Sequence, residues 1–239
     1  MNASPTLVLI NGKNPLSRGG GYQTYTYNLA KLLTSLGYRV HLFCFGRNNG
    51  VNRSSIGIIH TVASRFYYLP ILQSIEVAGL VVLAPILARA IGAAFDSTAR
   101  LVVWGMGPWT LAGAILKAFR RRNTHLVSSY LTTFAHEFQG TKRAVNLHDY
   151  GPQQVVKVWL VGKTLIPLYT FLERFFLGSS DIIVVHYRSA RRILSSQFGI
   201  AKTKLVRLPY YAEPVARIQA RQTAAIPIVS KPLVVIISR

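Results

Sequence analysis

The stretch that decides the fold is "TLVLINGKNPLSRGGGYQTYTYNLAKLLTSLGYRVHLFCF", residues 6–45. Apolar runs at 6–10 and 39–45 open and close it, as expected of strands buried on both faces. Between them lies one apolar stripe with the period of a helix, formed by Tyr25, Leu29, Leu32, Leu33 and Leu36. Gly37 then stands where a left-handed C-terminal cap is expected. A strand, a helix and a second strand predict a parallel pair joined by a right-handed crossover.

Apolar runs and helical patterns keep alternating along the rest of the chain. Further strands are predicted at 56–62, 101–104, 124–130, 181–185 and 204–208, and helices at 72–95, within 105–122, at 155–177 and at 189–199. The alternation predicts an α/β fold, a Rossmann-like parallel sheet with helices on both faces.

The character of the sequence changes after residue 214. Residues 1–214 hold the alternating elements and are expected to form one domain. Residues 215–232 are polar and punctuated by proline, which is typical of a linker. Residues 233–239, "LVVIISR", form an apolar run that we interpret as the first strand of a second domain, absent from this chain. Pairing of this run at the edge of the first sheet is the alternative.

The charge is strongly one-sided, with 28 Lys and Arg against 7 Asp and Glu and a net charge of +21. Such a field favours an anionic partner, either a phosphate-bearing substrate, an anionic membrane face or nucleic acid. No recognition helix, zinc spacing or RNA-binding signature accompanies the basic residues, so nucleic acid is not expected. The most apolar stretch, 77–88, is too short to span a bilayer, and no signal-peptide pattern opens the chain. We therefore expect a cytoplasmic protein, with peripheral contact to the inner face of the membrane as an option.

The glycine-rich loop before the first helix is the first candidate site. It contains Gly19, Gly20 and Gly21, followed by Tyr22. Glycines let the backbone approach a ligand closely, and a helix start favours a phosphate or a sugar hydroxyl. A dinucleotide fingerprint is not met, because Thr24 replaces its third glycine and residues 46–47 lack its acid. Glycines that serve the turn geometry alone are the alternative.

The second candidate site is the polar stretch 128–140, which follows a predicted strand. Thr133 and Glu137 are candidates for holding sugar hydroxyls, and the imidazole of His136 for a proton transfer. A polar loop with a structural histidine is the alternative. Arg188 follows the next strand, at a helix start, where it could meet an anionic group. No His-x-x-x-His spacing is present, so no metal is expected.

Four segments carry a resemblance to a known family. They are the three glycines before the first helix, then "LGYRVHLF", then "SSDIIVVHYRSARRILSSQFGIAKTKLVRLPY", and finally "LVVIISR". Their order resembles the N-terminal, acceptor-side domain of the family 4 retaining glycosyltransferases, which have the GT-B fold. The resemblance covers nearly the whole chain and implies that the sheet is one half of a GT-B fold.

The chain departs from that pattern in several places. Tyr210-Tyr211 stands for the Asn-Gly usual in the family, Ser238-Arg239 for Gly-Arg, and 105–108 for a stretch rich in His and Asp. The Glu-x7-Glu pair of the family's donor-binding half does not occur in this sequence.

The resemblance also implies a function. The parent reaction is transfer of a hexosyl group from a nucleotide sugar to a glycan or glycolipid, as in polysaccharide biosynthesis. Gly19–Gly21 match the loop that faces donor and acceptor, and His136 lies where the family often has a histidine near the reaction centre. The nucleotide sugar is expected on a missing C-terminal domain or a separate donor subunit, so this chain alone is expected to be inactive. A stand-alone acceptor-binding module or split-transferase subunit is one alternative, and a phosphate- or nucleic-acid-binding Rossmann domain is another.

Overall fold

The computed structural model describes residues 6–17, 20–68, 76–120, 123–131 and 161–208, together with positions 133, 136, 152, 155, 156 and 159. The chain divides into two compact units, Met1–Pro209 and Tyr210–Arg239, and every described residue belongs to the first. The predicted linker at 215–232 and the predicted last strand at 233–239 lie outside the described residues, so both stay predictions.

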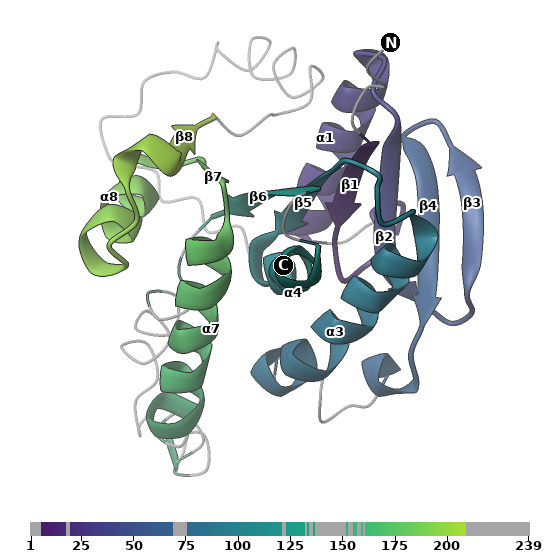
Figure 1. Ribbon diagram of the computed structural model, residues 1–239. Helices are drawn as coiled ribbons and strands as arrows, with labels where there is room; N and C mark the ends of the chain where they lie inside the picture. The colour runs from purple at the N-terminus through teal and green to yellow at the C-terminus, as the bar shows by residue number, and fades with distance from the viewer. Residues whose placement is uncertain are drawn as a thin grey trace, which may run out of the picture. The chain divides into compact units, whose positions relative to one another are not determined.

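One sheet of eight strands organises the first unit, in the order β3-β4-β2-β1-β5-β6-β7-β8 (Figure 1). Its strands are β1 Thr6–Ile10, β2 Val40–Gly46, β3 Gly50–Ser54, β4 Gly57–Ala63, β5 Leu101–Met106, β6 Thr124–Tyr130, β7 Ile182–Val185 and β8 Leu205–Arg207. All neighbouring pairs are parallel except β3 with β4. The strands predicted between residues 6 and 208 and the parallel sheet are therefore confirmed.

The helices follow the predicted alternation. Within the described ranges they are α1 Gly21–Ser35, α3 Glu76–Ala94, α4 Thr110–Phe119, α7 Ile166–Ser179 and α8 Arg188–Gln197, with a π turn, η3 Val161–Leu165, before α7. Short 3-10 turns lie at η1 Arg65–Tyr68, η2 Gly107–Trp109 and η4 Lys202–Lys204.

Helices cover both faces of the sheet, as the sequence predicts. The alternation of side chains along β1 shows the two layers, since Val8 and Ile10 belong to one apolar core and Leu7 and Leu9 to the other. Side chains of α3, α4, α7 and α8 build the first core, and those of α1 build the second. This arrangement is the Rossmann-like α/β architecture expected from the sequence.

Strand β3 is the element that the sequence pattern does not predict. Its central residues, Val51, Asn52 and Arg53, are exposed, so they show neither an apolar run nor a half-buried alternation. The strand forms because the hairpin pairs it with β4, with Gly50 opposite Thr61 and Ser54 opposite Gly57. An edge strand of this kind is defined by its partner rather than by its own side chains.

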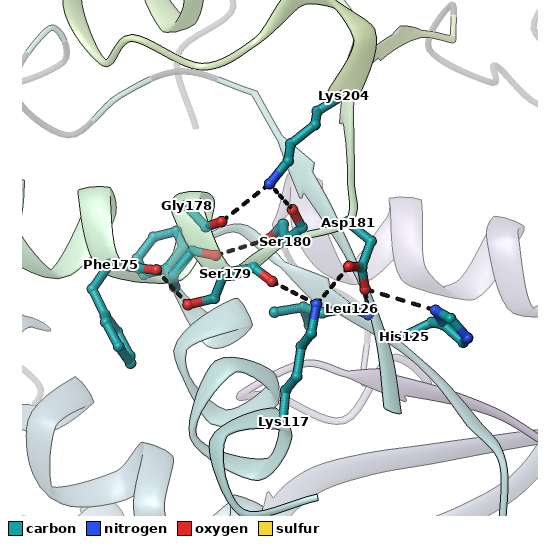
Figure 2. Close-up of polar contacts among 10 residues, drawn as sticks. Lys117, His125, Leu126, Phe175, Gly178, Ser179, Ser180, Asp181 and Lys204 are labelled. Carbon is teal, nitrogen blue, oxygen red and sulfur yellow. Dashed lines mark hydrogen bonds and ion pairs between the residues drawn. The ribbon is translucent and has the colours of Figure 1, made fainter. Parts of the chain in front are cut away.

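Two lysines stabilise the C-terminal end of α7 (Figure 2). Lys117 from α4 donates to the carbonyl oxygen of Ser179 at 2.9 Å, and Lys204 donates to those of Gly178 and Ser180 at 3.2 and 3.0 Å. Cations suit this position because the last carbonyls of a helix lack intrahelical partners and carry the negative end of its dipole. The lysines hold the turn from which β7 starts.

The carboxylate of Asp181 completes this corner. It accepts from the ammonium of Lys117 at 2.6 Å and from the backbone N–H of Leu126 at 2.8 Å, with His125 at 3.9 Å (Figure 2). Burial acts to raise the pKa of Asp181, but the bonds from Lys117 and Leu126 and the nearby positive charges outweigh it and lower that pKa. Helix α4, strand β6 and the start of β7 are therefore joined at the amino ends of the strands.

Candidate functional site

The candidate residues gather at the carboxyl edge of the sheet. Strands β1, β5, β6 and β7 are neighbours and parallel, so their carboxyl ends lie along one edge. Ligands of open α/β sheets bind at this edge. Gly20–Tyr22 come after β1, Thr133 and His136 after β6, and Arg188 after β7. Three strand spacings, about 14 Å in total, separate β1 from β7. The glycine loop and Arg188 therefore lie along the same edge but follow different strands.

A buried asparagine fixes the start of α1 to this edge. Asn11 directly follows β1, and its side-chain amide donates to the hydroxyl of Thr26 at 3.0 Å and to the carbonyl oxygen of Tyr22 at 3.4 Å. The hydroxyl of Thr26 donates to the same carbonyl at 2.6 Å. The first turns of α1 therefore cannot move without breaking bonds to the end of β1.

The glycine loop meets α1 at Gly20, which is the N-cap residue. Its φ of +98° is a left-handed conformation that side chains disfavour, and a Cβ there would stand 2.5 Å from Oε1 of Gln23. The amide of Gln23 in turn donates to the carbonyl and hydroxyl oxygens of Ser17, each at 3.4 Å. The backbone conformation therefore favours glycine at position 20, where a side chain would also displace the Gln23 amide. Gly19 lies outside the described residues.

Tyr22 joins the glycine loop to the end of β5. Its phenol ring lies on Gly107, where a Cβ would stand 2.6 Å from Cζ and 2.7 Å from the hydroxyl oxygen. Gly107 also has a positive φ of +54°. The structure therefore brings Gly20, Gly21 and Tyr22 together with η2, although the sequence offers no sign of this contact.

Thr133 and His136 lie close together after β6. The backbone N–H of His136 donates to the carbonyl oxygen of Thr133 at 3.1 Å and to its hydroxyl oxygen at 3.3 Å. Thr133 is buried, whereas the side chain of His136 is exposed. Thr133 therefore positions the backbone of His136, a role that the sequence does not indicate. Glu137 lies outside the described residues.

Arg188 is the first residue of α8, as the sequence predicts, and its side chain is exposed. The N-cap residue, Tyr187, makes no side-chain capping bond. An exposed guanidinium at the positive end of a helix dipole repels cations and attracts anions. The structure places Arg188 two strands from β5, on the far side of β6 from Tyr22.

A buried polar cluster behind the edge was not predicted. The indole N–H of Trp104 donates to the hydroxyl oxygen of Ser129 at 2.8 Å, and the hydroxyl of Tyr25 lies 3.2 Å from the same oxygen. The ring of Tyr25 meets that of His186 edge to face, with centroids 4.8 Å apart. The cluster joins β5, β6, α1 and the end of β7. No sequence signal reveals it, because its members are far apart in the chain.

His186 ties this cluster to the end of β8. Its Nδ1 lies 2.9 Å from the carbonyl oxygen of Leu208, which fits an N–H at Nδ1. Burial lowers the pKa of His186, while the bond to Leu208 acts in the opposite direction. The imidazole is therefore neutral at pH 7.

Two kinds of feature are absent from the described ranges. No three His, Cys, Asp or Glu side chains there lie close enough to hold a metal ion. No helix in the same part of the chain is long and apolar enough to cross a membrane.

The comparisons with known proteins agree with this geometry. A family model described as "Glycosyl transferase 4-like domain" matches residues 20–211. A sequence search of curated proteins finds no match.

Among solved structures, the chain is similar to sucrose-phosphate synthase from Thermosynechococcus elongatus, with 16% identity, a TM-score of 0.62 and coverage of 91% of this chain and 53% of that one. It is also similar to an alpha,alpha-trehalose-phosphate synthase (UDP-forming) from Burkholderia vietnamiensis, with 14% identity, a TM-score of 0.56 and coverage of 95% and 54%. A shorter chain of the Thermosynechococcus synthase matches with 12% identity and a TM-score of 0.53, over 92% of this chain and 96% of that one. The chain spans about half the length of the longer synthases, and its fold is one half of a GT-B fold.

Proposed function

The chain belongs to the Glycosyl transferase 4-like domain family, and from this premise we propose that it forms the acceptor-side half of a glycosyltransferase. The reaction would move a hexosyl group from a nucleotide sugar to a hydroxyl of a glycan or glycolipid. One observation carries the proposal. The glycine loop, His136 and Arg188 all follow strands that end at one edge of the sheet, where α/β folds bind ligands.

Each candidate residue has a role in this proposal. The backbone of Gly19, Gly20 and Gly21 and the ring of Tyr22 would line the approach of the substrates. Glu137 would hold sugar hydroxyls, and the buried Thr133 would contribute to the same site by positioning the backbone of His136. The exposed imidazole of His136 would assist the proton transfer at the acceptor hydroxyl. Arg188 would attract an anionic group of the substrate.

The nucleotide sugar would bind to a further domain or to a separate donor subunit. Glycosyl transfer requires donor and acceptor to be held together in a reactive geometry. We therefore expect no transfer by the 239-residue chain alone. Transfer is expected when the donor-binding partner is supplied. An acceptor-binding module that works without any donor half is the second candidate.

The partner expected from the net charge of +21 is an anionic surface or an anionic substrate. We propose a cytoplasmic protein that contacts the inner face of the membrane peripherally, where a glycolipid acceptor would reside.

A binding experiment tests the site independently of the reaction. Hexose phosphates and short glycans are titrated into the chain by calorimetry, and Arg188→Ala and His136→Ala are compared with Arg100→Ala. Arg100 is also an exposed arginine, but it precedes β5 at the opposite edge of the sheet. Loss of binding in the first two variants, with the third unchanged, supports the site. An equal effect of all three refutes it.

A transfer assay tests the division of labour. The chain is incubated with labelled nucleotide sugars and acceptor glycans, alone and together with a donor-binding partner. Activity of the chain alone would overturn the proposal that a donor half is needed.

A further inference from the structure

Helix α7 exposes several large apolar side chains to solvent. The exposed fractions are 44% for Leu168, 67% for Phe171 and 42% for Phe175, and Trp159, which precedes the helix, is 55% exposed. Other side chains of α7, such as Tyr169 and Phe176, belong to the core of the sheet. The helix is therefore apolar on its outer face as well as on its inner one, unlike an ordinary surface helix.

The outer residues form one continuous stripe. Trp159, Lys163, Pro167, Phe171 and Phe175 follow one another at intervals of four, and we call them the outer stripe. Intervals of four drift slowly around an α-helix, which has 3.6 residues per turn. The wider π turn at Val161–Leu165 accommodates extra residues and offsets part of this drift. Spacing and exposure thus agree that the side chains share a face.

Basic side chains lie within the outer stripe and on α7 beside it, at Lys163 and Arg174. The ammonium of Lys163 lies 4.4 Å from the centre of the Trp159 ring, and the guanidinium of Arg174 lies 5.9 Å from that of Phe198. The basic residues of the described range 161–208 are Lys163, Arg174, Arg188, Arg191, Arg192, Lys202, Lys204 and Arg207.

The acidic residues of the same range do not offset this charge. Glu173 is buried and accepts from the hydroxyl of Tyr130. Asp181 is bound to Lys117, a base from outside the range. The exposed charges of α7 and of the π turn before it are therefore basic, since Lys163 and Arg174 are exposed and Glu173 is buried.

We propose that the outer stripe of α7 is a docking surface for an anionic lipid bilayer. Aromatic side chains lie favourably at the interface of a bilayer, and nearby lysines and arginines are attracted to anionic headgroups. A second copy of the chain fits less well, because two surfaces with this net charge repel each other. The proposal specifies the anionic partner proposed above and therefore rests on it, but it does not depend on the transfer reaction.

Vesicle sedimentation tests the docking surface without any enzyme assay. The 239-residue chain is mixed with vesicles of phosphatidylcholine alone, or with about a third phosphatidylglycerol. Binding is expected to the anionic vesicles and to weaken strongly when salt is raised from about 0.1 M to about 1 M. Equal binding to both vesicle types would overturn the proposal, and so would no binding to either.

Paired variants locate the surface on the chain. Phe171→Ser with Phe175→Ser is expected to weaken partitioning onto anionic vesicles about tenfold or more, because two rings no longer enter the interface. Phe66→Ser is the matched control, since Phe66 is 50% exposed but lies in η1, after β4. Its partitioning should stay within about twofold of the original chain. Unchanged binding of the double variant would show that another face binds lipid, and would refute the proposal.

Trp159 provides a second readout in the unaltered chain. Lipids brominated in the acyl chain should quench its fluorescence on binding, and Trp159→Phe should remove most of the quenching while binding persists. Quenching that survives in Trp159→Phe would contradict insertion of the stripe. No sugar is present in these experiments, so their failure would not bear on the proposed transferase function. Failure of the sugar titrations would likewise not bear on the docking surface.

Discussion

The phenol ring of Tyr22 lies so close to Gly107 that a methyl group at position 107 would stand 2.6 Å from it. This contact joins the first turn of α1 to the turn that follows β5. Both segments lie at the edge of the sheet where the candidate site is found. The contact therefore fixes the distance between the start of α1 and η2.

Replacing Gly107 tests this relationship. Gly107→Ala is expected to lower the free energy of unfolding by about 1–3 kcal/mol, because it adds a clash with Tyr22 to a strained backbone conformation. In the double variant with Tyr22→Ala, the clash is removed and only the backbone strain remains. Urea unfolding is measured for the original chain, the two single variants and the double variant. The free energy of unfolding lost in the double variant should be smaller than the sum of the losses in the two single variants. Simple additivity would contradict the contact.

The buried pair of Tyr130 and Glu173 gives the second prediction. The hydroxyl of Tyr130 donates to the carboxylate of Glu173, which is fully buried in α7. Tyr130→Phe should cost about 1–3 kcal/mol of unfolding free energy, because a buried acceptor loses a donor. Glu173→Gln should cost less than Glu173→Leu, because the amide oxygen can still accept. Equal losses in the two Glu173 variants, measured by urea unfolding, would argue against the hydrogen bond.

Two stacked histidines predict a loss of stability in acid. Nδ1 of His41 lies 2.9 Å from Nε2 of His60 between β2 and β4. Burial, with the charges of His60 and Arg39, lowers the pKa of His41 from 6.5 to about 4, and burial lowers that of His60. As the pH falls from about 6.5 to about 4, the unfolded chain binds protons that the folded chain excludes. Each histidine then lowers the unfolding free energy by at most about 1.4 kcal/mol per pH unit.

His41→Phe should flatten this pH dependence, because an apolar ring suits a site beside Phe95. The control is His136→Asn, since the side chain of His136 is exposed. Unfolding free energies measured by urea between pH 7 and pH 4 compare the variants. An unchanged slope in His41→Phe would show that the acid sensitivity has another origin.

The lysines at the end of α7 give the fourth prediction. Lys117→Met removes both the cap on Ser179 and the partner of Asp181, and should cost about 1 kcal/mol. Lys204→Met removes only the hydrogen bonds to the carbonyl oxygens of Gly178 and Ser180, so it should lower the free energy of unfolding by less. Because the pKa of Asp181 is lowered, the contribution of its charge is full at neutral pH and is lost as the pH falls below its usual value of 3.8. The difference between the free energies of unfolding at pH 7 and at low pH should therefore be smaller in Lys117→Met than in the original chain.

The sequence predicts those elements whose signal lies within the element. Strand β1, helix α1 and strand β2 each show their own periodicity, and the first residue of α8 is marked by the end of a strand and a basic helix start. Strand β3 shows no such signal, because its exposed side chains reflect an edge that only the pairing with β4 creates.

The candidate site was predictable to a similar extent. The glycines and Arg188 are visible because loops after parallel strands share an edge. The cluster around Ser129 is not, because Tyr25 and Ser129 stand 104 positions apart and only the folded chain brings them into contact. The role of Thr133 is not visible in the sequence either. Only the fold shows that its hydroxyl oxygen accepts a hydrogen bond from the backbone N–H of His136.

The bond between His186 and the carbonyl oxygen of Leu208 has a mechanical consequence. Leu208, which directly follows β8, is bonded to an imidazole ring that packs against Tyr25 of α1. A displacement of the backbone at the end of β8 is therefore transmitted through one imidazole ring to Tyr25 and on to Ser129 in β6.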